Sequence, residues 1–194
     1  MKNKRQSTIK RFLIREFGEQ KGIFLFEKQE LLFQTLIERS KGKSKSQLKT
    51  LTQTILPVVA LYQVLAEFEP EEDAVFNIMR KYMIDIVAAD KNLSMAKMEK
   101  VPGFFYIYRS IFLKVMRTSD LWESTQKCGE KCYDVTITKC LWHEACLTYG
   151  CPELCRLFCD VDDVTYGGLN KIGFHRTKTL GCGGDCCDFH FFMK

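Results

Sequence analysis

The feature that most constrains the fold is a change in the spacing of apolar residues near Ser119. Before this point apolar residues recur every three or four positions, which is typical of amphipathic helices. After it, Tyr133, Val135 and Ile137 alternate with polar residues, which indicates a half-buried strand. Helices followed by a short sheet predict an α+β fold. We expect an N-terminal helical bundle packed on a small, mainly antiparallel C-terminal sheet with one inserted short helix.

Five amphipathic helices are predicted in the N-terminal part. They are expected over residues 5–17, 27–40, 48–65, 75–86 and 104–115. Pro57 is expected to kink the third helix near its start, because proline lacks a backbone N–H and its ring clashes with the preceding turn. Pro70, which three acidic residues follow, is a start signal for the fourth helix. The apolar stripes of these helices predict ordinary buried core.

Three strands and one helix are predicted after Ser119. The strands are expected over residues 133–138, 172–179 and 187–193, and a glycine-rich turn at 181–184 joins the last two. The inserted helix is expected to begin at Cys151 and to run to about Cys159, with Pro152 in its first turn.

The length of 194 residues and the apolar content of 46% are sufficient for one sizeable core. We therefore expect a single domain over residues 1–194. Within it, residues 1–118 would form the helical scaffold and residues 119–194 would carry the site.

The composition and charge also predict the cellular location of the protein and the classes of partner that it binds. No segment resembles an export signal, and the apolar run at residues 55–62 is shorter than the ~20 residues that a membrane helix needs. The net charge is +5, and the basic residues before position 50 cap or link helices. We expect a cytoplasmic protein with no membrane or nucleic-acid partner and with a small-molecule substrate. The sequence leaves the oligomeric state open.

The chain has ten cysteines. A reducing cytosol favours free thiols, catalytic thiolates or metal ligation over disulfides. Several pairs have three intervening residues, a spacing that zinc sites use. A zinc or iron–sulfur site would draw on Cys151, Cys155, Cys182 and Cys186. The spacing fits no common cluster motif, and the catalytic alternative expects no cofactor.

Cys151, Cys155 and Cys159 are four residues apart, so they would line one stripe of the inserted helix. Asp162 would extend this stripe if the helix continued for another turn. A thiol and a carboxylate would then face one cavity. The alternative is that these cysteines pack as small apolar residues.

The last two predicted strands add polar candidates. Asp188 and His190 would share one face of a regular strand, as an oriented acid–base pair or as exposed polar residues. Arg176 has the fork geometry that suits a substrate carboxylate, and a surface salt bridge is the alternative.

The segments VTITKC at 135–140, LFCDVD at 157–162 and RTKTLGCGGDCCDF at 176–189, with Gly150 between the first two, resemble the L-2-amino-thiazoline-4-carboxylic acid hydrolase family. The closing signature of that family is matched in register by six residues, which are Arg176, Thr179, Gly183, Cys187, Asp188 and Phe189. The helical stretch at 55–65 is also similar, so the resemblance covers roughly residues 45–192.

The resemblance implies hydrolysis of a cyclic isothiourea, in which a non-peptide C–N bond opens towards a carbamoylated cysteine. It implies a thiolate nucleophile at Cys159 or Cys187, and an amidine-binding proton carrier at Asp162 or Asp188. Arg176 would hold the ring carboxylate, and the expected substrate pocket also includes Thr179, Cys140 and His190. The cysteines outside the signature keep two alternatives open, which are a metal-binding or thiol-redox protein and a non-catalytic module that binds a small metabolite.

Overall fold

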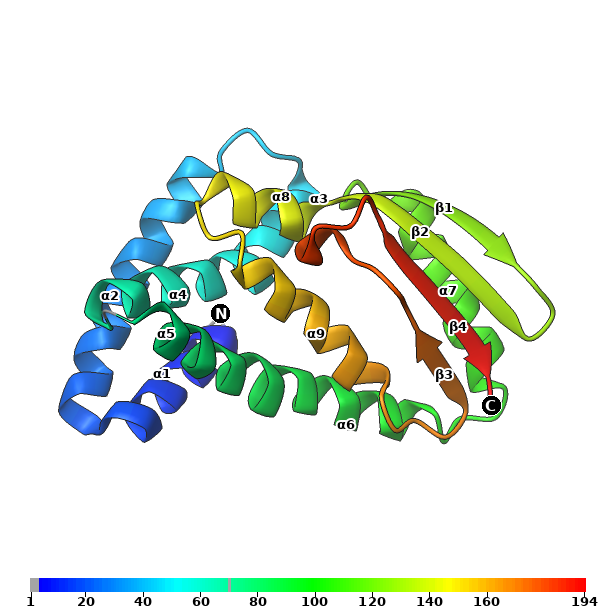
Figure 1. The fold of residues 1–194 in the computed structure, drawn as a ribbon, viewed down its shortest axis with the longest axis horizontal. Helices are drawn as coiled ribbons and strands as arrows, with labels where there is room; N and C mark the ends of the chain where they lie inside the picture. The colour runs from blue at the N-terminus through cyan, green and yellow to red at the C-terminus, as the bar shows by residue number, and fades with distance from the viewer. Residues whose placement is uncertain (1–3, 70) are drawn as a thin grey trace. The chain divides into compact units, whose positions relative to one another are not determined.

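The computed structural model describes residues 4–69 and 71–194, and it confirms the α+β class. The chain forms two compact units (Figure 1). The first unit contains Met1–Tyr82 and Ala145–Leu154, and the second contains Met83–Glu144 and Cys155–Lys194. Residues 83–118 therefore belong to the unit that carries the sheet. The expectation of a single domain stays a prediction.

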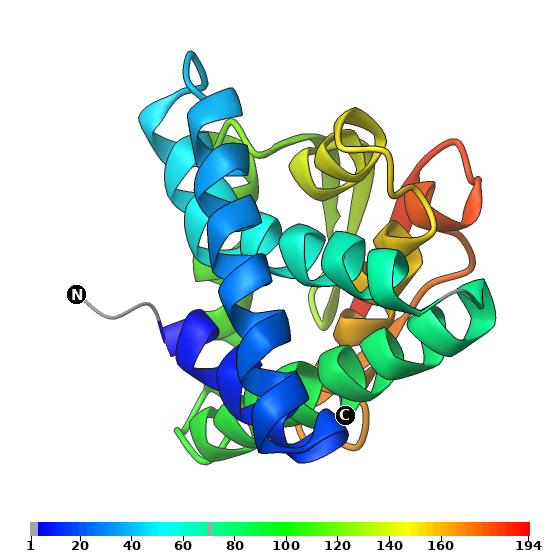
Figure 2. The same ribbon diagram turned by 90° about the vertical axis from the view of Figure 1, so that its left-hand side faces the viewer.

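The first unit is helical. It contains α1 (Lys4–Phe17), α2 (Glu19–Arg39), α3 (Lys45–Thr50), α4 (Leu56–Phe68) and α5 (Glu72–Arg80), and the blue helices α1 and α2 lie side by side in Figure 2. They meet at Gly22, where an added Cβ would lie 2.6 Å from the Cα of Ile14. The second helix begins eight residues earlier than predicted, directly after Gly18, whose φ of 78° separates it from α1. Pro70, the predicted start signal of the fourth helix, lies outside the described residues.

Pro57 is accommodated without ending its helix. A π-helical turn, η1 (Leu51–Ile55), directly precedes α4, and Pro57 is the second residue of α4. The carbonyl of Pro57 accepts a 2.9 Å hydrogen bond from the buried side chain of Gln29. The predicted distortion near Pro57 therefore takes the form of a wider turn ahead of it.

The helical stretch Lys45–Phe68 is the one candidate membrane span among the described residues, by length and composition alone. It is longer than the apolar run at 55–62 because the helix continues on both sides of that run, over residues 45–54 and 63–68. More than half of its most apolar window is buried inside the protein, as in the core helix of a soluble protein.

The second unit carries an antiparallel sheet. Its strands are β1 (Trp122–Cys128), β2 (Cys132–Cys140), β3 (Ile172–His175) and β4 (Cys187–Met193), in the order β1-β2-β4-β3. Its helices include α6 (Ala89–Met98), α7 (Phe104–Thr118) and α9 (Leu154–Tyr166), which starts at the boundary of the unit. The π-helical η2 (Lys81–Ala88) and α8 (Leu141–Thr148) each have residues in both units.

One face of the sheet forms the core of this unit. Tyr133 on β2 stacks on Phe191 of β4 with ring centroids 4.8 Å apart, and Phe112 of α7 packs against both. Tyr166, at the end of α9, meets the edge of Phe191. The ribbon shows α7 behind the sheet (Figure 1). The helix α9 is thereby anchored to the sheet at its C-terminal end.

The C-terminal part differs from the prediction in two additional elements and in the boundaries of β3 and α9. Strand β1 and helix α8 were not expected: β1 is an edge strand whose alternation of half-buried and exposed residues is weak. Strand β3 ends at His175 rather than at 179, because the N–H groups of Thr177 and Lys178 bind the carboxylate of Asp188. Helix α9 begins at Leu154 rather than at Cys151, and it runs past 159 to Tyr166.

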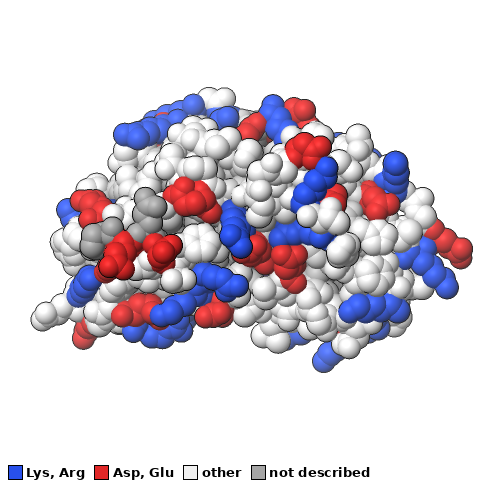
Figure 3. Space-filling view, in the orientation of Figure 1, with Lys and Arg blue, Asp and Glu red and all other residues white. Residues whose placement is uncertain are grey.

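Lys and Arg side chains are interspersed with Asp and Glu on the face drawn in Figure 3. This mixture resembles an ordinary solvated surface. The expectation that no nucleic acid is bound stays a prediction.

Candidate functional site

Helix α9 places two thiols and three carboxylates at one side of the second unit. Because the helix continues to Tyr166, the stripe of Cys155 and Cys159 is extended by Asp162, as the sequence predicted. Cys155 is buried, whereas Cys159 and Asp162 are half-buried. Cys151 lies before the helix, and its N–H instead bonds to the carbonyl of Cys146.

The loop between β3 and β4 passes directly against these thiols. A Cβ added to Gly181 would lie 2.9 Å from the sulfur of Cys155 and 2.9 Å from that of Cys159. The neighbouring Leu180 donates its N–H to the sulfur of Cys187 over 3.3 Å. Thr179 caps the short helix η3 (Leu180–Cys182) by accepting a hydrogen bond from the N–H of Cys182. Residue 181 must therefore be small for the loop to close over the helix.

Cys159 is the thiol whose ionised form is stabilised. Its sulfur receives hydrogen bonds from Cys155, then from Cys187 and Thr179, and the charge of Arg176 adds to them. These interactions outweigh burial and lower the pKa of Cys159 well below its ordinary value. The hydrogen bond to Cys159, together with burial, raises the pKa of Cys187. We infer a thiolate at Cys159 and a neutral thiol at Cys187.

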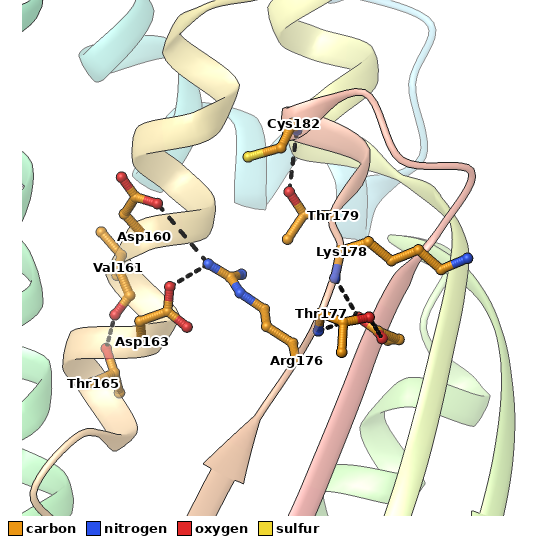
Figure 4. A network of polar contacts seen from close by, with 10 residues as sticks. Asp160, Val161, Asp163, Thr165, Arg176, Thr177, Lys178, Thr179 and Cys182 are labelled. Carbon is orange, nitrogen blue, oxygen red and sulfur yellow. Dashed lines mark hydrogen bonds and ion pairs between the residues drawn. The ribbon is translucent and has the colours of Figure 1, made fainter.

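Arg176 lies between this loop and α9 (Figure 4). Its Nη2 is 2.5 Å from a carboxylate oxygen of Asp163 and 4.0 Å from one of Asp160. Only 9% of its side chain is exposed, and its Nη1 is buried without a hydrogen-bond partner among the described residues. Burial alone lowers the pKa of Arg176, but the charges of Asp163 and Cys159 raise it overall. A buried charged donor without a partner is costly, so Nη1 is suited to a ligand anion.

Asp162 is the carboxylate with a strongly altered acidity. Burial raises the pKa of Asp162 to about 6. The charges of Cys159 and Asp163 add to this rise, and the nearby charge of Arg176 opposes it. A carboxyl group with such a pKa exchanges its proton near neutral pH, as general acids and bases do.

Asp188 holds the loop in place. Its carboxylate accepts hydrogen bonds from the N–H of Thr177 (2.9 Å), the N–H of Lys178 (2.8 Å) and the hydroxyl of Thr177 (2.5 Å). Burial raises the pKa of Asp188, but these bonds outweigh it and lower the pKa overall. All three bonds tie the loop to the start of β4. Asp188 thus fixes the stretch that carries Arg176 and Thr179.

His190 pairs with Asp134 rather than with Asp188. The Nδ1 of His190 lies 2.7 Å from a carboxylate oxygen of Asp134 on the neighbouring strand. Both side chains are about half exposed. This contact corresponds to the exposed polar pair that the sequence left as the alternative.

Cys140 joins the same region from the end of β2. Its sulfur accepts hydrogen bonds from the N–H groups of His143 and Trp142, in the first turn of α8. Burial nevertheless raises the pKa of Cys140 to about 11, and the charges of Cys159 and Asp162 contribute to the rise. Cys140 is therefore a neutral thiol close to the two ionisable groups of α9.

The described residues contain no group of three or more His, Cys, Asp or Glu side chains arranged to hold a metal ion. Of the four cysteines considered for zinc or an iron–sulfur centre, Cys151 lies in the first unit, and Cys155 donates to Cys159. Cys182 is exposed and Cys186 is buried. The geometry gives no support to a metal site built on these four residues.

Two features of the site escaped the sequence analysis. The carboxylates of Asp160 and Asp163 face Arg176, and Cys155 donates to the thiolate of Cys159. The helical spacing of Cys155 and Cys159 was visible in the sequence, but the partners of Arg176 depend on how the loop folds back on α9.

The site of this α+β protein thus brings together a thiol with a lowered pKa, a carboxyl group with a pKa of about 6 and a buried arginine. The model of the L-2-amino-thiazoline-4-carboxylic acid hydrolase family matches residues 49–191. The chain belongs to that family, and the match supports a hydrolase-like function.

The comparisons with solved structures give remote likenesses. One is to the crystal structure of an Fe(II) unliganded H-NOX protein from K. algicida, at 10% identity and a TM-score of 0.37, covering all of this chain and 97% of that chain. Another is to an H-NOX protein from S. oneidensis in the Fe(II)NO ligation state, at 12% identity and a TM-score of 0.34, covering all of this chain and 99% of that one. Likenesses at these scores carry no conclusion about ligand or activity. No curated protein matches the chain in sequence.

Proposed function

We propose that this protein hydrolyses a cyclic isothiourea that carries a carboxylate, with L-2-amino-thiazoline-4-carboxylic acid as the model substrate. The family match supports this class of substrate. The observation that carries the proposal is the position of the Cys159 thiol, whose pKa is lowered by the hydrogen bonds to it and by the charge of Arg176, near a guanidinium whose buried Nη1 has no partner among the described residues.

Cys159 is the proposed nucleophile. Sequence alone left Cys159 and Cys187 as alternatives, and the stabilised thiolate at Cys159 favours it, since thiolates attack carbon far better than thiols. Cys187, Cys155 and Thr179 would position this thiolate by donating hydrogen bonds to it.

Arg176 is the proposed carboxylate clamp. Its Nη2 is engaged by Asp163, so its orientation is fixed before a substrate arrives. Its Nη1 remains available for one oxygen of the ring carboxylate.

Asp162 is the proposed amidine-binding group and proton carrier, since Asp188 is engaged in holding the loop. In its ionised form Asp162 would hold the protonated amidine, whose central carbon is then more electrophilic. Its pKa of about 6 allows it to exchange a proton at neutral pH.

The reaction follows from these roles. The sulfur of Cys159 forms a bond to the amidine carbon, and the resulting tetrahedral adduct collapses by breaking the ring C–N bond. Asp162, which is ionised at this stage, takes a proton from the exocyclic nitrogen and transfers it to the departing ring nitrogen. Water then attacks the same carbon, Asp162 receives its proton, and the bond to Cys159 breaks to release a carbamoylated cysteine. The substrate gains one water and no cofactor takes part.

The setting of the reaction is also a proposal. A free thiolate requires a reducing compartment, which is consistent with a cytoplasmic location, and no disulfide joins the described cysteines.

The test is incubation of the purified full chain with the thiazoline, followed by mass spectrometry for a product that has gained one water. We expect turnover in the wild type and none in Cys159→Ala. Cys128→Ala, which removes an exposed thiol in the β1–β2 hairpin, is the matched control and should remain active. A thiol reagent then identifies the broken bond, because C–N cleavage leaves the product sulfur carbamoylated. An inactive wild type, or a fully active Cys159→Ala, would refute the proposal.

A further inference from the structure

Three thiols meet around the loop at Gly181, and we call Cys155, Cys159 and Cys187 the thiol cluster. Cys159 is hydrogen-bonded to both of the others. Two adjacent loop residues lie beside the cluster, since Leu180 donates its N–H to the sulfur of Cys187, and a Cβ added to Gly181 would lie 2.9 Å from each of the other two sulfurs. Hydrolysis as proposed above consumes only one thiol. At the other two positions a hydroxyl group could donate the same hydrogen bond to Cys159. The presence of a thiol at all three positions therefore needs a further explanation.

We propose that Cys159 and Cys187 form a modification site for hydroperoxides, which closes to a disulfide and thereby blocks the nucleophile. The blocking of hydrolysis rests on the proposed function, whereas the modification itself does not.

The chemistry proceeds in two steps. With hydrogen peroxide as the hydroperoxide, the thiolate of Cys159 attacks one oxygen, so that an S–O bond forms, the O–O bond breaks, and the other oxygen leaves as hydroxide, which takes up a proton as water. The sulfur is oxidised by two electrons to a sulfenic acid. The sulfur of Cys187 then attacks that of Cys159, an S–S bond forms, and the hydroxyl group leaves with the proton of Cys187 as a second water.

Cys187 is the partner that geometry favours over Cys155. Residues four apart on an α-helix have Cβ atoms about 5–6 Å apart. A disulfide requires Cβ atoms about 3.5–4.5 Å apart. Cys155 lies in the first turn of α9 and Cys159 in the second, so a bond between them would require the start of the helix to unwind. Cys187 comes from β4 and is not subject to that restriction.

Exposure alone predicts a different outcome, which makes the proposal testable. Cys128 and Cys182 are the exposed thiols, whereas Cys187 is buried and Cys159 is half-buried. Oxidation governed by access would therefore begin at Cys128 and Cys182. Oxidation governed by thiolate character would begin at Cys159.

The experiment treats the reduced full chain with one equivalent of hydrogen peroxide, quenches it with an alkylating reagent and maps the peptides by mass spectrometry. We expect a linked peptide pair that contains Cys159 and Cys187, and its loss on treatment with dithiothreitol. In Cys187→Ser the link should be absent and a dimedone adduct should accumulate on Cys159. Cys182→Ser, which removes an exposed thiol of the same loop, is the matched control and should keep the link.

The proposal is overturned if Cys128 or Cys182 is oxidised while Cys159 stays reduced, or if the link joins Cys159 to Cys155. Cys187→Ala must give the same dimedone adduct as Cys187→Ser, and circular dichroism must show that both variants are folded. Activity separates the two proposals. If the disulfide between Cys159 and Cys187 forms but the reduced protein does not hydrolyse the thiazoline, the modification site is supported and the proposed hydrolase function is rejected. If the protein hydrolyses the thiazoline, and peroxide neither changes this activity nor produces the disulfide, only the proposed modification site is rejected.

Discussion

Arg176 combines two tasks in one guanidinium group. One arm is held by Asp163, and the other is buried without a partner among the described residues. Lysine would keep the charge but could not serve both positions at once, because its ammonium is a single point charge. The fork of arginine therefore carries the specificity that we propose for a carboxylate.

Replacement of Arg176 tests whether the second arm of its guanidinium group binds the substrate carboxylate. Arg176→Lys should raise the KM for the thiazoline about 10- to 100-fold, as the loss of one charge-assisted hydrogen bond predicts. Steady-state kinetics would measure the change. Lys178→Ala is the control, since Lys178 is exposed and pairs with Asp185 at the surface, and it should leave KM unchanged. An unchanged KM in Arg176→Lys would show that the free arm of the guanidinium binds no substrate.

The raised pKa of Asp162 predicts how the activity depends on pH. If its ionised form binds the amidine, kcat/KM should rise as the pH increases through about 6, the pKa to which burial raises this carboxyl group. Asp162→Asn should lose this limb of the pH profile and should lower kcat about 100- to 10,000-fold. A profile of kcat/KM against pH with the same limb in the asparagine variant would assign the titration to another group.

Sequence reasoning correctly placed Cys159 and Asp162 on one stripe, because both lie on one regular helix, where spacing determines direction. It left Arg176 without its protein partners. Arg176 was expected within a strand that runs to position 179, and the strand ends at His175. The strand ends there because the carboxylate of Asp188 binds the backbone N–H groups of Thr177 and Lys178, which would otherwise pair with a neighbouring strand. The spacing of apolar residues gives no sign of these side-chain hydrogen bonds.

At the scale of the elements, alternation predicted the central strand β2 and the strand β4, because one face of each packs on aromatic residues. It missed β1, an edge strand with few apolar residues. The helices α1 and α7 were predicted almost to their ends, since their apolar stripes are strong. Helix α2 was predicted too short, because Gly22 lies inside it for a reason of packing rather than of turn formation.

That packing gives a prediction for α1 and α2. Gly22→Ala would place a Cβ 2.6–2.7 Å from backbone atoms of Leu13 and Ile14, which cannot move aside as a flexible side chain does. We expect the free energy of unfolding to fall by about 1–3 kcal/mol or more. Urea denaturation would measure it. Gln20→Ala, on the exposed side of the same helix, is the control. If Gly22→Ala lowered the free energy of unfolding no more than this control does, the close contact of α1 and α2 at Gly22 would not contribute to stability.

At the scale of the whole molecule, two carboxylates link stability to pH. Burial raises the pKa of Glu99, but hydrogen bonds from Lys171 and Asn170 outweigh it and lower the pKa, and Asp188 behaves in the same way. Both groups bind protons less readily in the folded than in the unfolded chain. Their stabilisation is therefore complete above their ordinary values of 4.5 and 3.8, and it is lost as the pH falls through the lowered values of the folded protein.

Acid denaturation should show this linkage. Glu99→Gln and Asp188→Asn should each lower stability at neutral pH and flatten its decline below pH 4.5. Thermal unfolding followed by circular dichroism over this range would reveal both effects. Asp185→Asn, at an exposed carboxylate of the same loop, is the comparison at the surface. Parallel pH curves for the wild type and for both variants would contradict the assignment.

The order of the strands also bears on how the protein is made. Strand β4 lies between β2 and β3, and it is the last of the four along the chain. The sheet consequently cannot close until residues 187–193 have left the ribosome, and Cys187 reaches Cys159 only with them. While the chain is being synthesised, the edge of β2 that β4 will occupy is unpaired, and Cys159 lacks the hydrogen bond from Cys187. The pKa of Cys159 should thus be higher in the nascent chain than in the folded protein, and its reactivity should become complete only with the final step of folding.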